Sequence, residues 1–260
     1  MIEVKNLVKK YGSHLAVDHL NFTVDTGQIY GFLGPNGAGK STTMNIMTGY
    51  LGATEGEVLI NGHNILEEPE AAKKCIGYLP EMPPLYTDMK VNEYLRFVAE
   101  LKKIPKPERQ EQIEKVMLMV KIMDVQDRLI KNLSKGYKQR VGIAQALLGS
   151  PRLIILDEPE TGLDFHNQIL VLNLVERLAH ESGISAIMNT HYPTNAMSVA
   201  DEALMLNRKG EFFYGPAAEI LNEKNISYSF DVQVLVDELH YQGRSVRSIV
   251  PVGLREETAV

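Results

Sequence analysis

Residues 34–42 read Gly-Pro-Asn-Gly-Ala-Gly-Lys-Ser-Thr, and they follow the apolar stretch GQIYGFL at residues 27–33. The first eight of these residues, 34–41, fit the phosphate-binding pattern G-x-x-x-x-G-K-[ST] in the context it requires, after a strand and before a helix. Glycines let successive backbone N–H groups turn inward as an anion nest, and the N-terminus of the following helix adds a favourable dipole. A chance glycine-rich turn would need loop, strand and helix to coincide by accident. The stretch therefore predicts a loop that holds the phosphates of a nucleotide.

Each position of this loop has an expected task. Lys40 would place a positive charge beside the β and γ phosphates, and the hydroxyl of Ser41 would bind Mg²⁺. The other positions expected to bind ATP are Gly34, Asn36, Gly37, Ala38, Gly39 and Thr42.

A second signal is the stretch Leu153-Ile-Ile-Leu-Asp157-Glu158, an apolar strand that ends in two acids. Such a strand delivers carboxylates to the C-terminal edge of a sheet, where α/β folds bind ligands. We expect Asp157 to hold Mg²⁺ and Glu158 to orient or deprotonate the attacking water. Because many strands end in an acid, this pattern indicates a nucleotide site only in combination with the phosphate loop.

A third signal is Leu133-Ser134-Lys135-Gly136-Tyr137-Lys138-Gln139-Arg140. A serine ahead of a helix is ordinarily an N-cap, which is the plain interpretation of Ser134. Helices are predicted over residues 91–103, 108–123, 134–149 and 167–181, and strands over 153–157, 184–190 and 203–215. Strands that alternate with helices predict an α/β fold with a largely parallel sheet. The last stretch, from about residue 226, is predicted as strand, helix, strand.

The composition limits the classes of protein to which the chain can belong. The 260 residues carry 44% hydrophobic side chains, enough for a sizeable core, and a net charge of −6, which argues against nucleic-acid binding. A single cysteine, Cys75, excludes an intrachain disulfide and suits a reducing compartment. The apolar stretches are far shorter than the roughly 20 residues that span a bilayer, and the first residues do not look like a signal peptide. We expect a chain that is soluble by itself.

Taken together and in this order, the motifs resemble those of the ATPase subunits of ABC transporters, over roughly residues 1–220. Residues 34–42 resemble Walker A, residues 133–140 the signature LSGGQ-x-QR, and residues 153–158 Walker B. Residues 160–164 resemble the D-loop, His191 matches the switch histidine, and Tyr11 stands where the family has the aromatic that stacks on adenine.

This resemblance implies a fold and a division into parts. The expected fold is a RecA-like P-loop NTPase core with a mostly parallel sheet, an N-terminal antiparallel β subdomain and an inserted helical subdomain at about residues 88–150. The ATPase domain would cover residues 1–224 and a small extension residues 225–260.

Three of the matched residues have plainer alternatives. Tyr11 is also compatible with an ordinary half-exposed aromatic at a strand end. His191 follows an apolar strand and is compatible with a core histidine, although its place after Walker B favours a role at the γ-phosphate. Asp164 is compatible with a helix cap, and both roles can hold together.

The chain also departs from the family pattern. Lys135 and Tyr137 replace the usual glycine and glutamine of the signature, while Ser134 and Gly136 are intact. Glu81 replaces the Q-loop glutamine; a carboxylate can face Mg²⁺ but donates no hydrogen bond. Glu160 stands where the family usually has a neutral residue. The Leu-Ser-Lys-Gly-Tyr signature with a Glu in the Q-loop resembles the bacterial exporters of drugs, sodium, lantibiotics and the gliding-motility type.

The resemblance further implies partners. Ser134 and Gly136 of a second copy would close the site, so that ATP joins two subunits in a homodimer or a paralogous heterodimer. Residues 81–88 would touch a transmembrane permease, placing the chain at the cytoplasmic side of the membrane. Alternatives are a soluble ABC ATPase acting on DNA or ribosomes, a P-loop kinase or GTPase, and a regulatory subunit that binds ATP without hydrolysis. Lys40, Asp157, Glu158 and His191 together favour turnover.

Overall fold

The computed structural model describes residues 2–255 and contains a six-stranded sheet at its centre. The strand order is β10-β9-β3-β8-β7-β6, in which all neighbours run parallel except β10 and β9. The strands are β3 Ile29–Leu33, β6 Ile76–Leu79, β7 Leu153–Asp157, β8 Ser185–Asn189, β9 Glu202–Leu206 and β10 Phe212–Pro216. This mostly parallel arrangement confirms the predicted α/β class.

The middle strands of this sheet are buried on both faces, which explains their continuous apolar sequence. Every residue of β3 and β8 is buried, and so are the first four residues of β7. Because these strands are parallel neighbours, their C-terminal ends meet at one edge. The loops that begin after β3, β7 and β8 therefore come together there.

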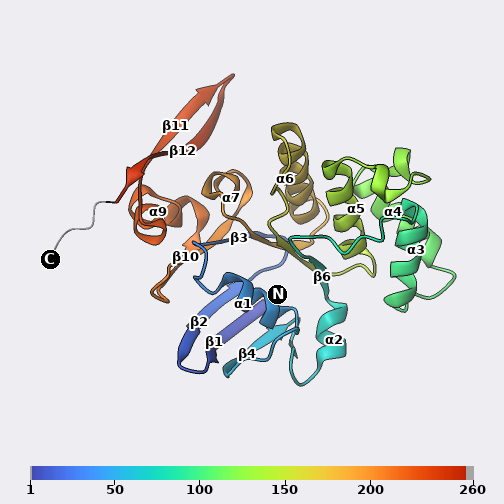
Figure 1. Ribbon diagram of the computed structural model, residues 1–260, viewed down its shortest axis with the longest axis horizontal. Coiled ribbons are helices and arrows are strands. Elements are labelled where there is room, and N and C mark those ends of the chain that lie inside the picture. The colour runs from blue at the N-terminus through green and yellow to red at the C-terminus, as the bar shows by residue number, and fades with distance from the viewer. Residues whose placement is uncertain (1, 256–260) are drawn as a thin grey trace.

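A second sheet is antiparallel and formed by the N-terminal part of the chain, as predicted. Its order is β2-β1-β4-β5, with β1 Ile2–Tyr11, β2 His14–Val24, β4 Glu55–Ile60 and β5 His63–Asn64. Helix α1, Lys40–Met47, lies beside this sheet and beneath the central one (Figure 1). One hydrophobic cluster fills the space between them and includes Leu20, Phe32, Met44 and Ile155.

Helices cover the other face of the central sheet (Figure 1), except α2 (Pro69–Lys74), whose Ala72 packs into the same cluster as α1. Their bounds are α2 Pro69–Lys74, α3 Val91–Leu101, α4 Arg109–Met119, α5 Lys135–Leu147, α6 Phe165–His180, α7 Pro193–Val199, α8 Ala217–Ile220 and α9 Glu223–Phe230, with short 3-10 turns at Met123–Val125 and Ile130–Asn132. Of these, α3, α4, α5 and α6 begin and end within a few residues of their predicted positions, whereas α2, α7, α8 and α9 were not predicted. No helix within residues 2–255 is long and apolar enough to cross a membrane.

Helices α3, α4 and α5 fall inside the range predicted for the helical subdomain. The buried residues of α3 recur at helical spacing, so that one face packs into a cluster shared with α4 and α5. The ammonium of Lys102, just after α3, donates to the carbonyl oxygens of Ala146 and Leu148 at 3.0 and 2.7 Å. These carbonyls end α5, where a cation is favourable.

The tail differs from its predicted strand, helix, strand order. Residues 223–230 form α9, because Asn222 caps the helix by accepting from the Asn225 N–H at 2.9 Å. The predicted helix is instead strand β11, Val232–Tyr241, which pairs with β12, Arg244–Leu254. Gln242 and Gly243 both have positive φ, 47° and 76°, the geometry of a tight two-residue hairpin turn.

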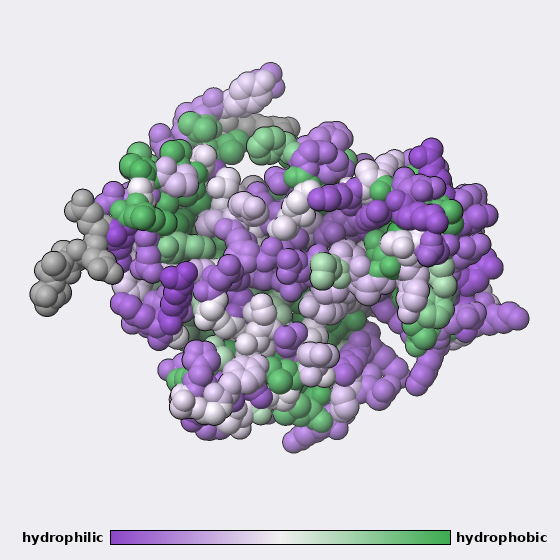
Figure 2. Space-filling view, viewed as in Figure 1, coloured by the Kyte–Doolittle hydropathy of each residue, from purple (hydrophilic) through white to green (hydrophobic). Residues whose placement is uncertain are grey.

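The hairpin has two unlike faces. Val234, Val236 and Ile249 pack against α7 and α9, in a cluster with Ile226. The opposite face exposes apolar side chains, which are Leu235, Leu239, Tyr241, Val246 and Val250. Figure 2 shows hydrophobic residues gathered around α9 and the base of the hairpin, whereas the α3–α4 end is largely hydrophilic.

Candidate functional site

A cavity of about 340 Å³ lies at the edge where the parallel strands end. It is lined by residues from five segments, namely Tyr11, His14, Ala16, Asn36, Gly37, Gly39, Lys40, Ser41, Thr42, Glu81, Glu158 and His191. The structure thus brings together most of the predicted nucleotide-site residues, which are up to 180 positions apart in the chain. Gly34, Ala38 and Asp157 belong to the same loops but do not line the cavity.

The phosphate loop depends on glycine at position 39. Gly39 has φ of 91° and forms the N-cap of α1. A Cβ atom there would lie 2.3 Å from the carbonyl oxygen of Ala16 in β2, which is backbone and cannot move aside. The close approach of β2 therefore fixes the loop in its curled form.

Lys40 is held inside this curl. Its side chain is only 5% exposed, and its ammonium donates to the carbonyl oxygens of Gly34 at 2.6 Å and Pro35 at 3.1 Å. Burial lowers the pKa of Lys40 to about 8, against the nearby charges of Glu158 and Asp157, which raise it. A polyphosphate in the loop would supply the negative charge that the buried ammonium lacks.

The two acids after β7 are oriented by different donors. Asn189, at the end of β8, donates to Oδ1 of Asp157 at 2.6 Å. The carboxylate of Glu158 contacts Nε2 of His191 through Oε1 at 2.6 Å and accepts from the Thr161 hydroxyl through Oε2 at 3.0 Å. Glu158 has a left-handed φ of 49°, and its N–H donates to the Asn189 carbonyl at 2.9 Å. Both acids are thereby tied to the neighbouring strand.

The predicted magnesium ligands are compatible with that ion. Mg²⁺ is bound by oxygen and usually keeps waters and substrate phosphates as ligands. Ser41 and Glu81 line the cavity. The negative charge of Asp157 raises the pKa of Lys40, the neighbour of Ser41 in the phosphate loop. No group of three or more His, Cys, Asp or Glu side chains suited to a metal exists within residues 2–255.

Tyr11 lies at the rim of the cavity, at the end of β1. It is 49% exposed, and the ammonium of Lys9 lies 5.4 Å from its ring centroid. It pairs across the hairpin with His14, which lines the cavity as well. An exposed ring at a cavity edge can stack on a purine.

The signature residues do not line this cavity. Ser134 is exposed and caps α5, accepting from the N–H of Tyr137 at 3.4 Å, as the plain interpretation predicts. The Tyr137 hydroxyl donates to Asp124 at 2.7 Å, and the guanidinium of Arg140 lies 4.1 Å from the Tyr137 ring centroid. The substitution at position 137 therefore braces the start of α5 within the same subunit.

Gly136 is buried against the beginning of α6. A Cβ atom at Gly136 would lie 2.1 Å from Oδ1 of Asn167. Asn167 is held by Asp164, which accepts from its N–H at 2.8 Å and from its side-chain amide at 2.9 and 3.0 Å. Asp164 is thus the helix cap that one interpretation predicted, and it connects the signature to the D-loop segment.

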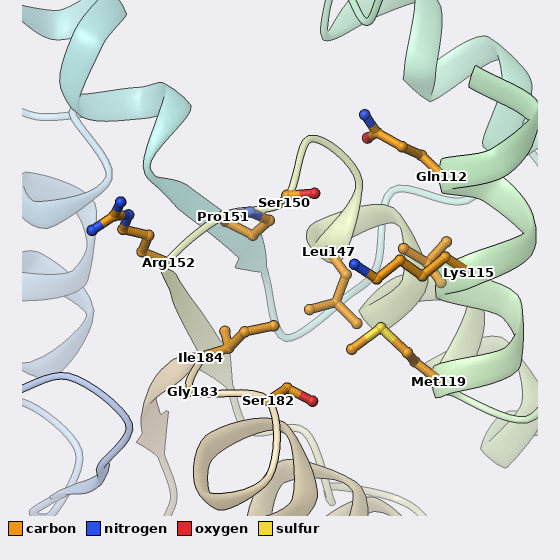
Figure 3. A pocket seen from close by; sticks show the side chains of 11 residues that line it. Gln112, Lys115, Met119, Leu147, Ser150, Pro151, Arg152, Ser182, Gly183 and Ile184 are labelled. Carbon is orange, nitrogen blue, oxygen red and sulfur yellow. The ribbon is translucent and has the colours of Figure 1, made fainter. Parts of the chain in front are cut away.

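Another cavity, of about 420 Å³, lies at the opposite end of β7 and β8 (Figure 3). Arg152 and Pro151 come just before β7, and Ile184 just before β8, while Met119 and Lys115 extend from α4. Among the described residues that line it, none is acidic and none belongs to a predicted motif. The described residues of this cavity include no acidic group that could act on water or help to hold Mg²⁺, so the smaller cavity is the candidate nucleotide site.

Four residues of the site were not predicted from the sequence, namely His14, Ala16, Thr161 and Asn189. His14 belongs to the turn that carries Tyr11, and the short hairpin at residues 11–14 was the available signal. Thr161 and Asn189 orient Glu158 and Asp157. Asn189 is the last residue of an apolar strand, the same signal that identified Asp157.

Comparison with known proteins agrees with this geometry. Residues 17–161, more than half of the chain, match the family model described as ABC transporter. The bacitracin transport ATP-binding protein BcrA of Bacillus licheniformis is 34% identical over 228 residues, covering 88% of this chain and 73% of that protein. ABC transporter A family member 1 of Dictyostelium discoideum is 33% identical over 217 residues, covering 84% of this chain, which spans only 24% of that protein's length.

A solved structure shows the same fold. It is the dimeric structure of a post-hydrolysis state of the ATP-binding cassette MJ0796 bound to ADP and Pi. The TM-score is 0.72 and the identity 26%, over 84% of this chain and 99% of that chain.

Proposed function

The chain belongs to the ABC transporter family of ATP-binding proteins, and from that premise we propose that it binds and hydrolyses ATP to energise a membrane transporter. The observation that carries the proposal is the convergence of the phosphate loop, Glu81, Glu158 and His191 on one cavity. In this proposal Lys40 holds the phosphates, Tyr11 contacts the base, and Glu158 and His191 act at the γ-phosphate.

Each residue has a distinct part in the reaction. Glu158 would accept a proton from, or orient, the attacking water, and its two donors fix the direction of its oxygens. His191 would contact the γ-phosphate and stabilise the charge that builds up there. Bound Mg²⁺, held by Ser41 and Asp157 with Glu81 near, would neutralise phosphate charge.

We propose that the complete site needs a second copy of the chain. Ser134 is exposed on the start of α5, away from its own cavity, and is free to meet the ATP of a partner. ATP bound between two subunits favours the closed pair because the γ-phosphate contacts both. Hydrolysis removes that contact and reopens the dimer. The dimeric cassette structure among the comparisons supports this arrangement.

The segment 81–88 is proposed as the contact with a transmembrane permease. Met82 is 83% exposed and Tyr86 54% exposed, both apolar side chains on the surface. Tyr86 packs edge-on against Phe97 of α3, with ring centroids 5.3 Å apart, and the Tyr94 hydroxyl donates to the Pro84 carbonyl at 3.2 Å. A movement of this segment would carry α3, and with it the helical region, as a rigid body.

We further propose export as the direction of transport. Support comes from the Lys135 and Tyr137 departures in the signature and from the likeness to BcrA, whose name assigns it to bacitracin transport. Co-isolation of the tagged chain from membranes, followed by reconstitution of the complex in vesicles, tests both partner and direction. ATP-driven accumulation of a substrate inside inverted vesicles supports export, and movement the other way refutes it. Co-isolation with DNA or ribosomes instead of a membrane protein would favour the soluble alternative.

A further inference from the structure

Glu160 is a carboxyl group that the fold buries completely. Its side chain is 0% exposed, and among the described residues its Oε2 atom finds no hydrogen-bond partner. It lies two residues after Glu158, at a position where the resembled family usually has a neutral residue. Burying a carboxyl group with one oxygen unsatisfied costs free energy. A leucine or methionine would fill similar space without that cost.

The other oxygen of Glu160 has one well-defined partner. Oε1 accepts the hydrogen bond of the Thr190 hydroxyl. The same hydroxyl oxygen accepts from the N–H of Tyr192 at 3.0 Å. Thr190 is itself 0% exposed, and its N–H donates to the Phe32 carbonyl at 3.1 Å. His191 therefore lies between two residues that are joined through one hydroxyl.

This bonding explains why an acceptor is useful at position 160. Once the Thr190 oxygen has accepted from Tyr192, its own proton needs an acceptor in a buried place. Glu160 supplies that acceptor. The chain Glu160–Thr190–Tyr192 connects the segment after β7 with the loop after β8, the two segments whose ends meet at Glu158 and His191.

The electrostatic surroundings favour a neutral carboxyl group. Burial raises the pKa of Glu160, the hydrogen bond from Thr190 acts in the opposite direction, and the charge of Glu158 raises it further. A neutral group would add no negative charge behind Glu158. The acceptor role toward Thr190 is available in either protonation state.

We propose that Glu160 is a positioning residue for His191. By accepting the Thr190 hydrogen bond, it fixes the backbone on both sides of the histidine and keeps the imidazole against Glu158. The inference rests on the proposed ATPase function and deepens it, because it assigns a task to a residue that touches neither nucleotide nor metal.

The test compares two substitutions that differ only in the acceptor. Glu160→Met keeps the length of the side chain and removes the acceptor; Glu160→Gln keeps a carbonyl oxygen toward Thr190. We expect Glu160→Met to lower kcat about tenfold or more, because small displacements of reacting groups are costly, with Kd for ATP unchanged. Glu160→Gln should keep kcat close to that of the wild type.

Ser185→Ala is the matched control, since it removes a buried hydroxyl at the far end of β8. Ser185 is 1% exposed and is bonded to Gly27 and Asp25, away from the cavity. The control should lower the unfolding midpoint without lowering kcat. If Glu160→Met loses kcat only in proportion to its folded fraction, or if Glu160→Gln is no better, the inference is overturned.

Substitutions of Thr190 provide an independent second test, which can still be carried out if Glu160→Met does not fold. Thr190→Val should lower kcat as Glu160→Met does, and Thr190→Ser should restore it. The double variant Glu160→Met with Thr190→Val should lose no more than the worse single variant, because both remove the same bond. Wild-type kcat in Thr190→Val would overturn the inference.

The proposed function is tested separately in the same assay. Wild-type turnover and its loss in Glu158→Gln establish the ATPase reaction without reference to Glu160. If turnover is absent in the wild type, the proposed function fails and this inference fails with it. If turnover is present and Glu160→Met retains it, only the positioning role is refuted.

Discussion

The imidazole of His191 lies against the carboxylate of Glu158, with 2.6 Å between Nε2 and Oε1. The two residues follow neighbouring parallel strands, and the register of those strands pairs Asp157 with Asn189. The contact is therefore set by the sheet. Thr161 holds the second oxygen of the same carboxylate, so Glu158 has its direction fixed before any substrate enters.

Replacing Glu158 with glutamine should separate binding from turnover. The amide keeps the size of the side chain but cannot take a proton from water. We expect ATP to bind, the hydrolysis rate to fall by about 10² or more, and ATP-bound dimers to accumulate. Phosphate release and light scattering with ATP, ADP and no nucleotide measure this. Unchanged turnover would remove Glu158 from its assigned part.

Gly39→Ala should abolish ATP binding, because the new Cβ would meet the Ala16 carbonyl at 2.3 Å and φ is 91°. Gly62→Ala is the control: Gly62 also has positive φ, 85°, but a Cβ there meets nothing within 4 Å. We expect the control to be destabilised by about 1 kcal/mol and to bind ATP normally. Titration with a fluorescent nucleotide distinguishes the two, and normal binding by Gly39→Ala would contradict the account of the loop.

Gly136→Ala should weaken ATP-driven pairing without weakening ATP binding to the single subunit. The added methyl would push on Asn167 and so displace the Asp164 cap. Removing the obstructing side chain with Asn167→Ala in the same protein should restore part of the pairing. Light scattering of each variant with ATP, in a Glu158→Gln background, gives the comparison. A double variant that pairs no better than Gly136→Ala would exclude Asn167 as the obstacle.

The stability of Glu160→Gln should depend on pH differently from that of the wild type. Burial raises the pKa of Glu160 above its usual 4.5. At pH values between 4.5 and the raised pKa, the folded state therefore binds more protons than the unfolded state. Stability from this group is present at low pH and is lost as pH rises through that window. Urea unfolding at a series of pH values rising from 4.5 should therefore show Glu160→Gln gaining stability relative to the wild type. If the unfolding free energies of the two proteins change with pH in parallel, the raised pKa of Glu160 is contradicted.

Much of the site could be predicted because its residues are local motifs with one physical purpose each. The glycines of 34–39 and Lys40 form a phosphate loop by themselves, and Asp157 and Glu158 end an apolar strand. Parallel pairing of β3, β7 and β8 then brings those motifs to one edge without further information. His191 was assigned from its resemblance to the switch histidine of the family, and the structure places it after β8 at the same edge.

Other features depend on contacts between distant segments and could not be predicted. The burial of Glu160 rests on Thr190, 30 residues away, and nothing local to either residue indicates it. In the tail, the last predicted strand is confirmed as β12, but the first strand and the helix are wrong, because short apolar runs suit helix or strand equally. The positive φ at Gln242 and Gly243 allows the hairpin that the structure shows. The division into parts at residues 88–150 and 225–260 stays a prediction.

The bonds from Lys102 to the last carbonyls of α5 have a mechanical consequence. They fasten one end of α5 to α3, while the Tyr137 hydroxyl fastens the other end to Asp124. A helix held at both ends transmits a push almost without bending. In the proposed dimer, a displacement of the surface beside α3 would therefore reach Ser134 through a helix that is anchored at both ends.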